Sequence, residues 1–222
     1  IYTWNPGHRA RVGVLRKDAP GSSIVWCDVD PCYVFHPCNA FETPDGRITL
    51  DVVAHATMFA NSKNGPNADA SGFERWTIDL AACQVTRQVV DASPQEFPRP
   101  DERLLGQPYR YAWCASLQRD SAGEFVGGSQ LIRHDMETGT REVHDFGAHT
   151  HVGEFVFQPR HPGADEADGW LMGLVVHADS QTTDFVILDA RRFTGPPQAV
   201  VTLPHRVPAG FHGNWVPAAG PR

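Results

Sequence analysis

The feature that most constrains the fold of this chain is its density of residues that interrupt regular structure. In its 222 residues, 18 prolines and 20 glycines separate short runs of β-branched and aromatic residues. No window keeps an apolar period of 3.6 residues long enough for an amphipathic helix, so the runs favour strands. The predicted strands are residues 47–53, 74–80, 84–90, 128–134, 141–146, 170–177, 184–189 and 199–203. The sequence therefore predicts a nearly all-β protein of many short antiparallel strands.

A weak internal repeat narrows the choice of architecture. Asp79, Asp135 and Asp189 each end a predicted strand that turns into another, and they lie 56 and 54 residues apart. This interval is slightly longer than the roughly 40–50 residues of common propeller blades, and strand–turn–strand suits the outer hairpin of a blade. We therefore predict about three β-propeller blades with flanking strands, in one domain over residues 1–222. The alternative is a β-sandwich with coincidental spacing.

The same interval predicts where the inner strands of the blades begin. We place these starts near Tyr33, Tyr109, Glu154 and His212. Because the inner strands of a propeller line its central channel, two histidines and a glutamate are expected where such folds hold axial ligands. The two histidines are His36 and His212.

Composition excludes several classes of function. The net charge of −7 comes without a run of lysine or arginine, so we do not expect a nucleic-acid partner. We find no stretch of about 18 apolar residues and no leader peptide. Five cysteines without C-x-x-C spacing indicate neither a disulfide framework nor a zinc ribbon and fit a reducing cytoplasm. The chain opens on Ile1 rather than methionine, which indicates a truncated protein.

Most of the eleven histidines have an ordinary interpretation. We expect surface positions for a group in polar surroundings: His8, His134, His144, His161 and His177. His149 and His151 have the i, i+2 spacing that places both rings on one strand face, and a metal site there is a minor alternative.

Two further histidines stand in aromatic or glycine-rich segments. These are His36, in residues 31–42, and His212, in residues 206–217. A buried imidazole must be neutral or paired, and metal ligation is one way to satisfy it. Pattern alone leaves a core histidine and a metal ligand equally open for each.

Four segments, in this order, resemble signatures of the carotenoid cleavage oxygenases, a family that includes lignostilbene dioxygenases. They are 35–42 (FHPCNAFE), 96–99 (EFPR), 153–160 (GEFVFQPR) and 204–215 (PHRVPAGFHGNW). The opening residues 11–14 (RVGV) also fit, so the resemblance covers essentially the whole chain. Each motif is moderately specific by itself, and four in order are a strong signal.

The resemblance implies a seven-bladed propeller with iron(II) on its axis, held by four histidines. By the resemblance of the motifs, His36 corresponds to the third iron ligand of the family and His212 to the fourth. Both are expected to bind the same metal ion. Glu96 is then expected to orient His36, and Glu154 to orient His212, by accepting the second ring N–H. Without the motif, Glu96 would be interpreted as an exposed loop carboxylate.

The implied reaction is cleavage of a carbon–carbon double bond with O2 to give two carbonyl products. Four imidazoles on an octahedral ion leave two positions for dioxygen and water. The implied substrate is an apolar conjugated molecule, a carotenoid or apocarotenoid in preference to a stilbene, with peripheral membrane contact for access. Aromatic residues flank the predicted ligands and suit a tunnel or plain core packing: Phe35, Phe41, Phe155, Phe211 and Trp215.

One departure from the family pattern limits this interpretation. The first two histidine ligands of the family lie upstream of the residues present here, together with the remainder of the propeller. We therefore expect residues 1–222 by themselves to bind iron weakly and to be inactive. A non-catalytic propeller that binds apolar ligands or protein partners remains the alternative.

Overall fold

A computed structural model describes residues 3–60, 71–119, 125–208, 210–216 and 218. In these segments the chain forms strands and two three-residue 3-10 helices, η1 (Gly21–Ser23) and η2 (Glu102–Leu104). Ile1, on which the expected truncation rests, lies outside them. Nowhere in the described segments does a helix reach the length and apolar character needed to cross a bilayer.

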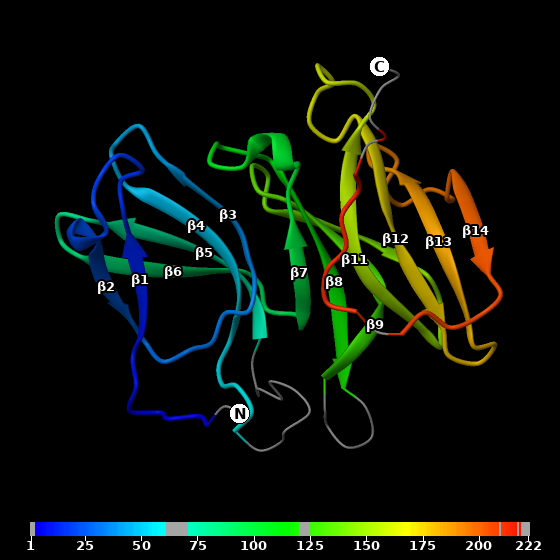
Figure 1. Cartoon of the computed structure of the whole chain (residues 1–222), viewed down its shortest axis with the longest axis horizontal. Helices are drawn as coiled ribbons and strands as arrows, with labels where there is room; N and C mark the ends of the chain where they lie inside the picture. The colour runs from blue at the N-terminus through cyan, green and yellow to red at the C-terminus, as the bar shows by residue number, and fades with distance from the viewer. Residues whose placement is uncertain (1–2, 61–70, 120–124, 209, 217, 219–222) are drawn as a thin grey trace. The chain divides into compact units, whose positions relative to one another are not determined.

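The eight predicted strands are all present in the structure (Figure 1). They are β4 (Ile48–His55), β5 (Ser71–Asp79), β6 (Gln84–Asp91), β9 (Phe125–Asp135), β10 (Thr140–Asp145), β12 (Gly169–His177), β13 (Thr182–Asp189) and β14 (Ala199–Leu203). The described residues form six more strands: β1 (Ala10–Val14), β2 (Val25–Val29), β3 (Pro37–Glu42), β7 (Gln95–Arg99), β8 (Tyr111–Arg119) and β11 (Thr150–Pro159).

Three four-stranded sheets carry most of these strands. Their orders are β3-β4-β5-β6, β10-β9-β8-β7 and β11-β12-β13-β14, so every neighbour in a sheet is also the neighbour in sequence. The pairings with described register are antiparallel throughout. Strands β1 and β2 form a separate pair. Four-stranded meanders are the blades of a propeller, which confirms the prediction of about three blades with flanking strands.

The repeated aspartates close the outer hairpin of each blade in the same way. Oδ1 of Asp79 accepts the backbone N–H groups two and three residues later, at 2.9 and 3.0 Å. Asp135 and Asp189 repeat this arrangement with their own following residues at 3.0–3.1 Å. A short carboxylate that binds the backbone ahead of it stabilises a tight turn. The repeat therefore has a structural cause at the β5–β6, β9–β10 and β13–β14 turns.

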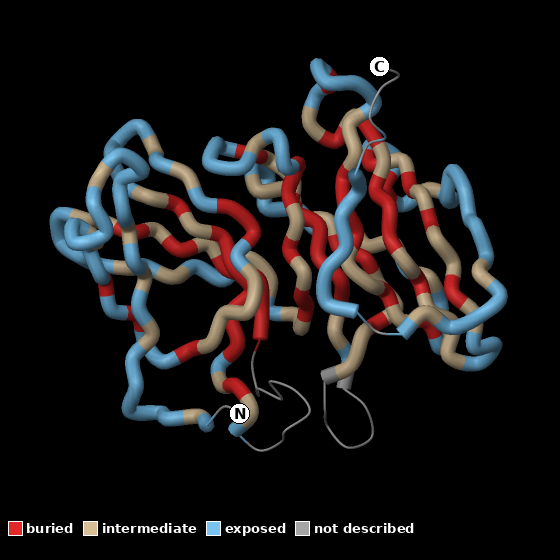
Figure 2. Tube along the Cα trace, in the orientation of Figure 1, coloured by how far each residue is buried: buried red, intermediate tan, exposed pale blue. Residues whose placement is uncertain are grey.

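Tertiary contacts divide the chain into two units, each with buried residues along its strands (Figure 2). Unit 1 comprises residues 1–98, 104–108 and 117–126, and unit 2 comprises residues 99–103, 109–116 and 127–222. In unit 1 a cluster forms around Trp76 and Val52. In unit 2 the ring of Trp113 stacks on that of Phe157, with centroids 5.3 Å apart.

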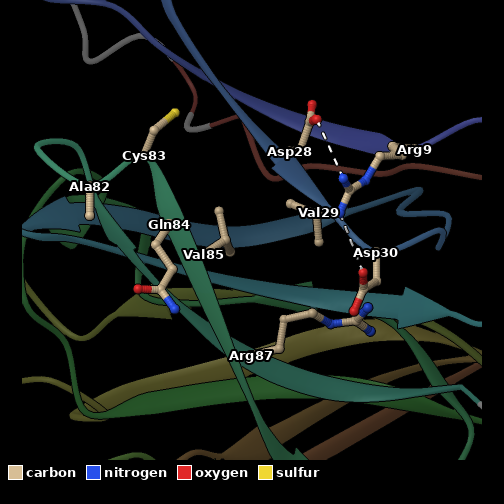
Figure 3. A pocket seen from close by; sticks show the side chains of 9 residues that line it. All are labelled: Arg9, Asp28, Val29, Asp30, Ala82, Cys83, Gln84, Val85 and Arg87. Atoms are coloured by element: carbon tan, nitrogen blue, oxygen red, sulfur yellow. Dashed lines mark ion pairs between the residues drawn. The ribbon is translucent and has the colours of Figure 1, made fainter.

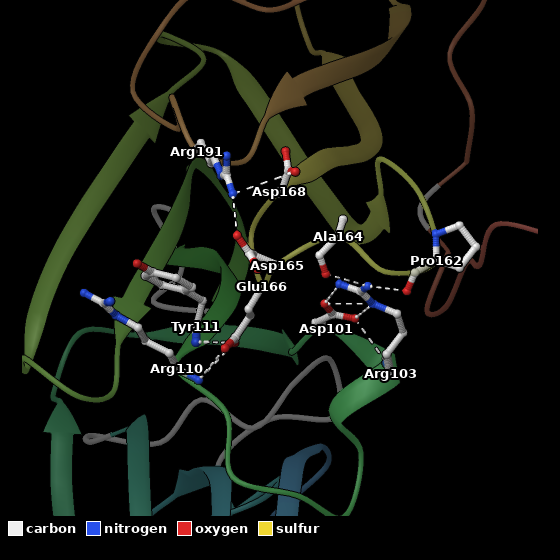
Figure 4. A network of polar contacts seen from close by, with 10 residues as sticks. All are labelled: Asp101, Arg103, Arg110, Tyr111, Pro162, Ala164, Asp165, Glu166, Asp168 and Arg191. Carbon is white, nitrogen blue, oxygen red and sulfur yellow. Dashed lines mark hydrogen bonds and ion pairs between the residues drawn. The ribbon is translucent and has the colours of Figure 1, made fainter.

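A polar network in unit 2 fixes the connection between β11 and β12 (Figure 4). The Arg103 guanidinium donates to the carbonyl oxygens of Pro162 and Ala164 at 3.0 and 2.9 Å. The Glu166 carboxylate accepts the backbone N–H groups of Arg110 and Tyr111 at 2.8–3.0 Å. Residues 162–166 of this connection are thereby bonded to Arg103 and to the start of β8.

The predicted starts of the inner strands are only partly right. Strand β8 begins at Tyr111, close to Tyr109, whereas β11 begins four residues before Glu154. Tyr33 forms an isolated bridge to His55. The strand predicted at His212 is wrong, because the described residues after β14 contain no strand. These residues are rich in proline and glycine, which disfavour ladder hydrogen bonds.

Candidate metal centre

His36 lies directly before β3, on the edge of the first blade. Its carbonyl oxygen accepts the N–H of Val53 at 3.2 Å, which ties the residue to β4. The side chain is 21% exposed, so the ring is largely covered by protein but accessible at one side. The rings of Phe35 and Phe97 lie 6.2 and 5.1 Å from the imidazole, centroid to centroid.

Glu96, on β7, contacts His36 as the motifs predict. Its Oε2 lies 2.7 Å from His36 Nδ1. The carboxylate is only 8% exposed and is therefore not a loop group in solvent. Burial raises the pKa of Glu96, but hydrogen bonds from His36 and His55 outweigh it, so the pKa of this carboxyl lies below its usual value. An ionised carboxylate only accepts hydrogen bonds, so His36 carries a proton on Nδ1 in this pair.

His55 is a second imidazole on the same carboxylate, and sequence reasoning missed it. It ends β4, is fully buried, and places Nε2 2.6 Å from Glu96 Oε1. The signal in the sequence is a histidine that ends the apolar run of residues 52–54, where it must be buried with a polar partner.

Glu154 and His212 form the second predicted pair, in unit 2. His212 Nδ1 lies 3.4 Å from Glu154 Oε1, and the N–H of Gly213 donates to Oε2 at 2.8 Å. The glutamate is 5% exposed, whereas His212 is 56% exposed. At 3.4 Å the ring contact is at the long end for a hydrogen bond, and the backbone contact is the stronger of the two.

A β-bulge positions Glu154. The register of β11 against β12 shifts between Val152 and Phe155, which leaves Glu154 in the irregular step. Bulges redirect a side chain that regular pairing would place elsewhere. Arg99 Nη1 donates to Glu154 Oε1 at 2.9 Å. Arg99 belongs to the EFPR motif, and the sequence alone indicates no role for it.

Asn39, in the first motif, has a structural role within unit 1. Its amide nitrogen donates to the carbonyl oxygens of Leu104 and Gln107, at 3.0 and 3.1 Å. Its oxygen accepts the N–H groups of Ala40 and Gly106, both at 2.9 Å. The three bonds to Leu104, Gly106 and Gln107 hold residues 104–107 next to β3, which gives this motif residue a structural role.

The other histidines divide into surface and buried positions. His149 precedes β11 in a left-handed conformation (φ 62°), and His151 Nδ1 contacts the carbonyl of Gly127 at 2.7 Å. His149 lies outside the strand, so the predicted shared strand face is wrong. His134, on β9, is 2% exposed, so its predicted surface position is wrong. His177 is partly exposed, and its Nε2 lies 2.7 Å from Asp184 Oδ2.

The flanking aromatic residues also fall into two groups. Phe155 is buried and belongs to the core of unit 2, whereas Phe211 and Trp215 are 79% and 48% exposed. Phe35 and Phe41 are intermediate. The described ring contacts of a predicted ligand are those of His36 with Phe35 and Phe97.

A pocket of about 510 Å³ lies in unit 1, and none of these groups lines it (Figure 3). Its lining includes Arg9, Asp28, Asp30 and Arg87, and Arg9 lies 3.8 and 3.7 Å from the two aspartates. An apolar conjugated molecule needs an apolar wall, so this charged pocket does not suit it.

Imidazole ligands suit a transition-metal ion of intermediate hardness, such as iron, copper or zinc. Two imidazoles each direct Nδ1 at a buried carboxylate, an arrangement that orients histidine ligands in metalloproteins. The described residues contain no cluster of three or more histidine, cysteine or acidic groups. The predicted ligands lie one in each unit, so their convergence on one ion stays a prediction.

Comparisons with known proteins agree with the motifs. The family model of the retinal pigment epithelial membrane protein, RPE65, matches residues 1–217. A carotenoid cleavage oxygenase of Mycobacterium tuberculosis is 39% identical over 97% of this chain and 44% of its own length. Resveratrol cleavage oxygenase 1 of Botryotinia fuckeliana is 32% identical over 86% of this chain and 37% of its own length.

A solved structure extends the agreement to the fold. The crystal structure of cobalt-substituted apocarotenoid oxygenase from Synechocystis superposes with a TM-score of 0.85 at 32% identity, over 96% of this chain and 45% of that one. This chain thus spans less than half the length of the relatives it matches. With the family model matched over nearly all of its residues, the chain belongs to the RPE65 family, the family of the carotenoid cleavage oxygenases.

Proposed function

We propose that the protein containing this chain is a non-heme iron(II) dioxygenase that cleaves a carbon–carbon double bond of a carotenoid or apocarotenoid. One alkene and one O2 give two carbonyl products, with both oxygen atoms retained. A stilbene-type substrate is the alternative. The contact between Glu96 Oε2 and His36 Nδ1, at 2.7 Å, is the observation that carries the proposal.

The residues of this chain have separate tasks in the proposed reaction. His36 and His212 supply Nε2 atoms as ligands, together with two further histidines from outside these residues. Glu96 and Glu154 hold the two rings in the Nδ1–H form. When bound, iron(II) supplies the activation of O2, which the side chains cannot provide.

The substrate class rests on the relatives and on the rings near His36. One relative is named for carotenoid cleavage at 39% identity, and another for resveratrol cleavage at 32%. Phe35 and Phe97 lie beside the His36 ring and offer apolar surface to a conjugated chain. The higher identity favours the carotenoid class.

The test uses the protein with its complete natural chain, loaded anaerobically with iron(II). An apocarotenoid and a hydroxystilbene are supplied in air, and carbonyl products are identified by liquid chromatography with mass spectrometry. We expect two aldehydes from the apocarotenoid, and their loss in His36→Ala and in His212→Ala but not in His177→Ala. Binding of the substrate without cleavage would refute the enzyme and support a binding propeller.

A further inference from the structure

His55 is the second partner of Glu96, and nothing in the proposed ligand set accounts for it. The residue ends β4, and Tyr33 and His55 exchange backbone hydrogen bonds at 2.8 Å in both directions. Its side chain has no exposure to solvent, and the ring meets Phe35 edge-on at 5.4 Å. A polar ring buried this completely is fixed in place by its partners.

The two oxygens of Glu96 serve different donors. Oε2 accepts from His36 Nδ1 at 2.7 Å and from the N–H of Phe97 at 3.0 Å, whereas Oε1 lies 2.6 Å from His55 Nε2. Because a carboxylate only accepts, His55 must carry its proton on Nε2. Both rings therefore donate to one carboxylate, from opposite ends of it.

Glu154 in unit 2 also has a second side-chain donor, but this donor is an arginine rather than a histidine. There the Arg99 guanidinium donates to Oε1 at 2.9 Å, while His212 and the N–H of Gly213 also contact the carboxylate. Each glutamate that faces a predicted ligand thus has one further cationic or neutral N–H donor. In unit 1 this donor is His55.

We infer that His55 is a positioning residue, which holds the Glu96 carboxylate in the orientation that keeps His36 protonated at Nδ1. Removal of a donor from a buried carboxylate leaves an acceptor unsatisfied, and the group rotates to recover a partner. His36 would then lose the fixed acceptor for Nδ1–H. The inference rests on the proposed function only where it concerns metal binding.

The variants are chosen to separate the hydrogen bond from the volume of the ring. His55→Phe keeps a ring of similar size without a donor, and His55→Gln restores an N–H near the position of Nε2. His177→Phe is the matched control, because it removes a histidine from Asp184 at a similar distance of 2.7 Å in another blade.

The first measurement is ¹⁵N nuclear magnetic resonance of the histidine rings in the metal-free protein with its complete natural chain, at pH 7.5. In the wild type we expect Nε2–H for His55 and Nδ1–H for His36. An Nδ1–H form of His55 would overturn the inference even if the variants fail to fold. In His55→Phe we expect His36 to become a mixture of tautomers, whereas His55→Gln and His177→Phe keep the wild-type form.

The second measurement is the cobalt(II) affinity of the same proteins. We expect His55→Phe to weaken binding about tenfold, the lower end of the range for groups that orient ligands, with His55→Gln near the wild type. Unchanged tautomers together with unchanged affinity in folded His55→Phe would contradict the inference. A wild type that binds no cobalt would refute the metal site, while the resonances of the metal-free protein would still decide the role of His55.

Discussion

The two glutamates that face the predicted ligands should differ in their importance for metal binding. Glu96 accepts three N–H groups at 2.6, 2.7 and 3.0 Å, and its side chain is 8% exposed. Glu154 lies 3.4 Å from the ring of His212, which is 56% exposed. We therefore predict that Glu96→Gln weakens metal binding more than Glu154→Gln.

The chemistry of the amide sets the magnitude. Glutamine offers one accepting oxygen and one donating NH2, so either His36 or His55 would face a donor in place of an acceptor. If His36 moves its proton to Nε2, the atom assigned to the metal is blocked. The loss of such an orienting group typically costs 10–100-fold in affinity, and we expect Glu96→Gln near 100-fold.

Glu154→Gln should be milder for two reasons. The ring contact is long, and Arg99, at 2.9 Å from Oε1, can still donate to an amide oxygen. We expect a loss of about tenfold or less. The difference between the two variants is then about 1.4 kcal/mol, which corresponds to a factor of ten.

The assay is anaerobic competition for cobalt(II) between the protein with its complete natural chain and a chelator that reports its own metal by absorbance. Glu137→Gln is the control, since this exposed carboxylate pairs only loosely with Arg110, at 3.5 Å. Equal losses for the two variants, or a greater loss for Glu154→Gln, would refute the reasoning from contact distance and burial.

Two further predictions concern stability within unit 2. Gly173→Ala places a Cβ in steric conflict with the ring of buried Phe155. We therefore expect the free energy of unfolding in denaturant to fall by about 1–3 kcal/mol, and an unchanged midpoint would contradict this expectation. The hydrogen bond from Arg110 lowers the pKa of Asp135 to about 2. Since the pKa in the unfolded chain is about 3.9, the contribution of Asp135 to stability is complete above that pH and is lost as the pH falls through about 2. In Asp135→Asn, the midpoint of thermal unfolding should therefore depend less on pH over this acid range.

The strands were predictable because their signal is local. Runs such as residues 184–189 combine β-branched residues with flanking turns, and β13 follows that run with two more residues at its start. The repeated aspartates were recognised from spacing, and each binds the backbone ahead of it in its turn. The hydrogen bonds of these aspartates within their turns therefore explain why the blade repeat is visible in the sequence.

Features that depend on distant contacts were not predictable in the same way. The segment around His212 resembles a strand in its aromatic content, but its described residues form no strand, as its proline and glycine content favours. His55 lies 41 residues before Glu96, and no periodic pattern relates the two. The bulge at Glu154 depends on the register of β12. Motif resemblance identified the Glu96–His36 pair, and pattern reasoning alone had left it open.

The most direct test of the metal centre is crystallography of the complete natural protein loaded with cobalt(II) or iron(II), with anomalous data collected at the metal edge. We predict one strong anomalous peak at about 2 Å from the Nε2 atoms of both His36 and His212, the usual length of a metal–imidazole bond. Peaks bound by only one of these histidines, or by neither, would contradict the central claim that the two histidines hold one catalytic ion.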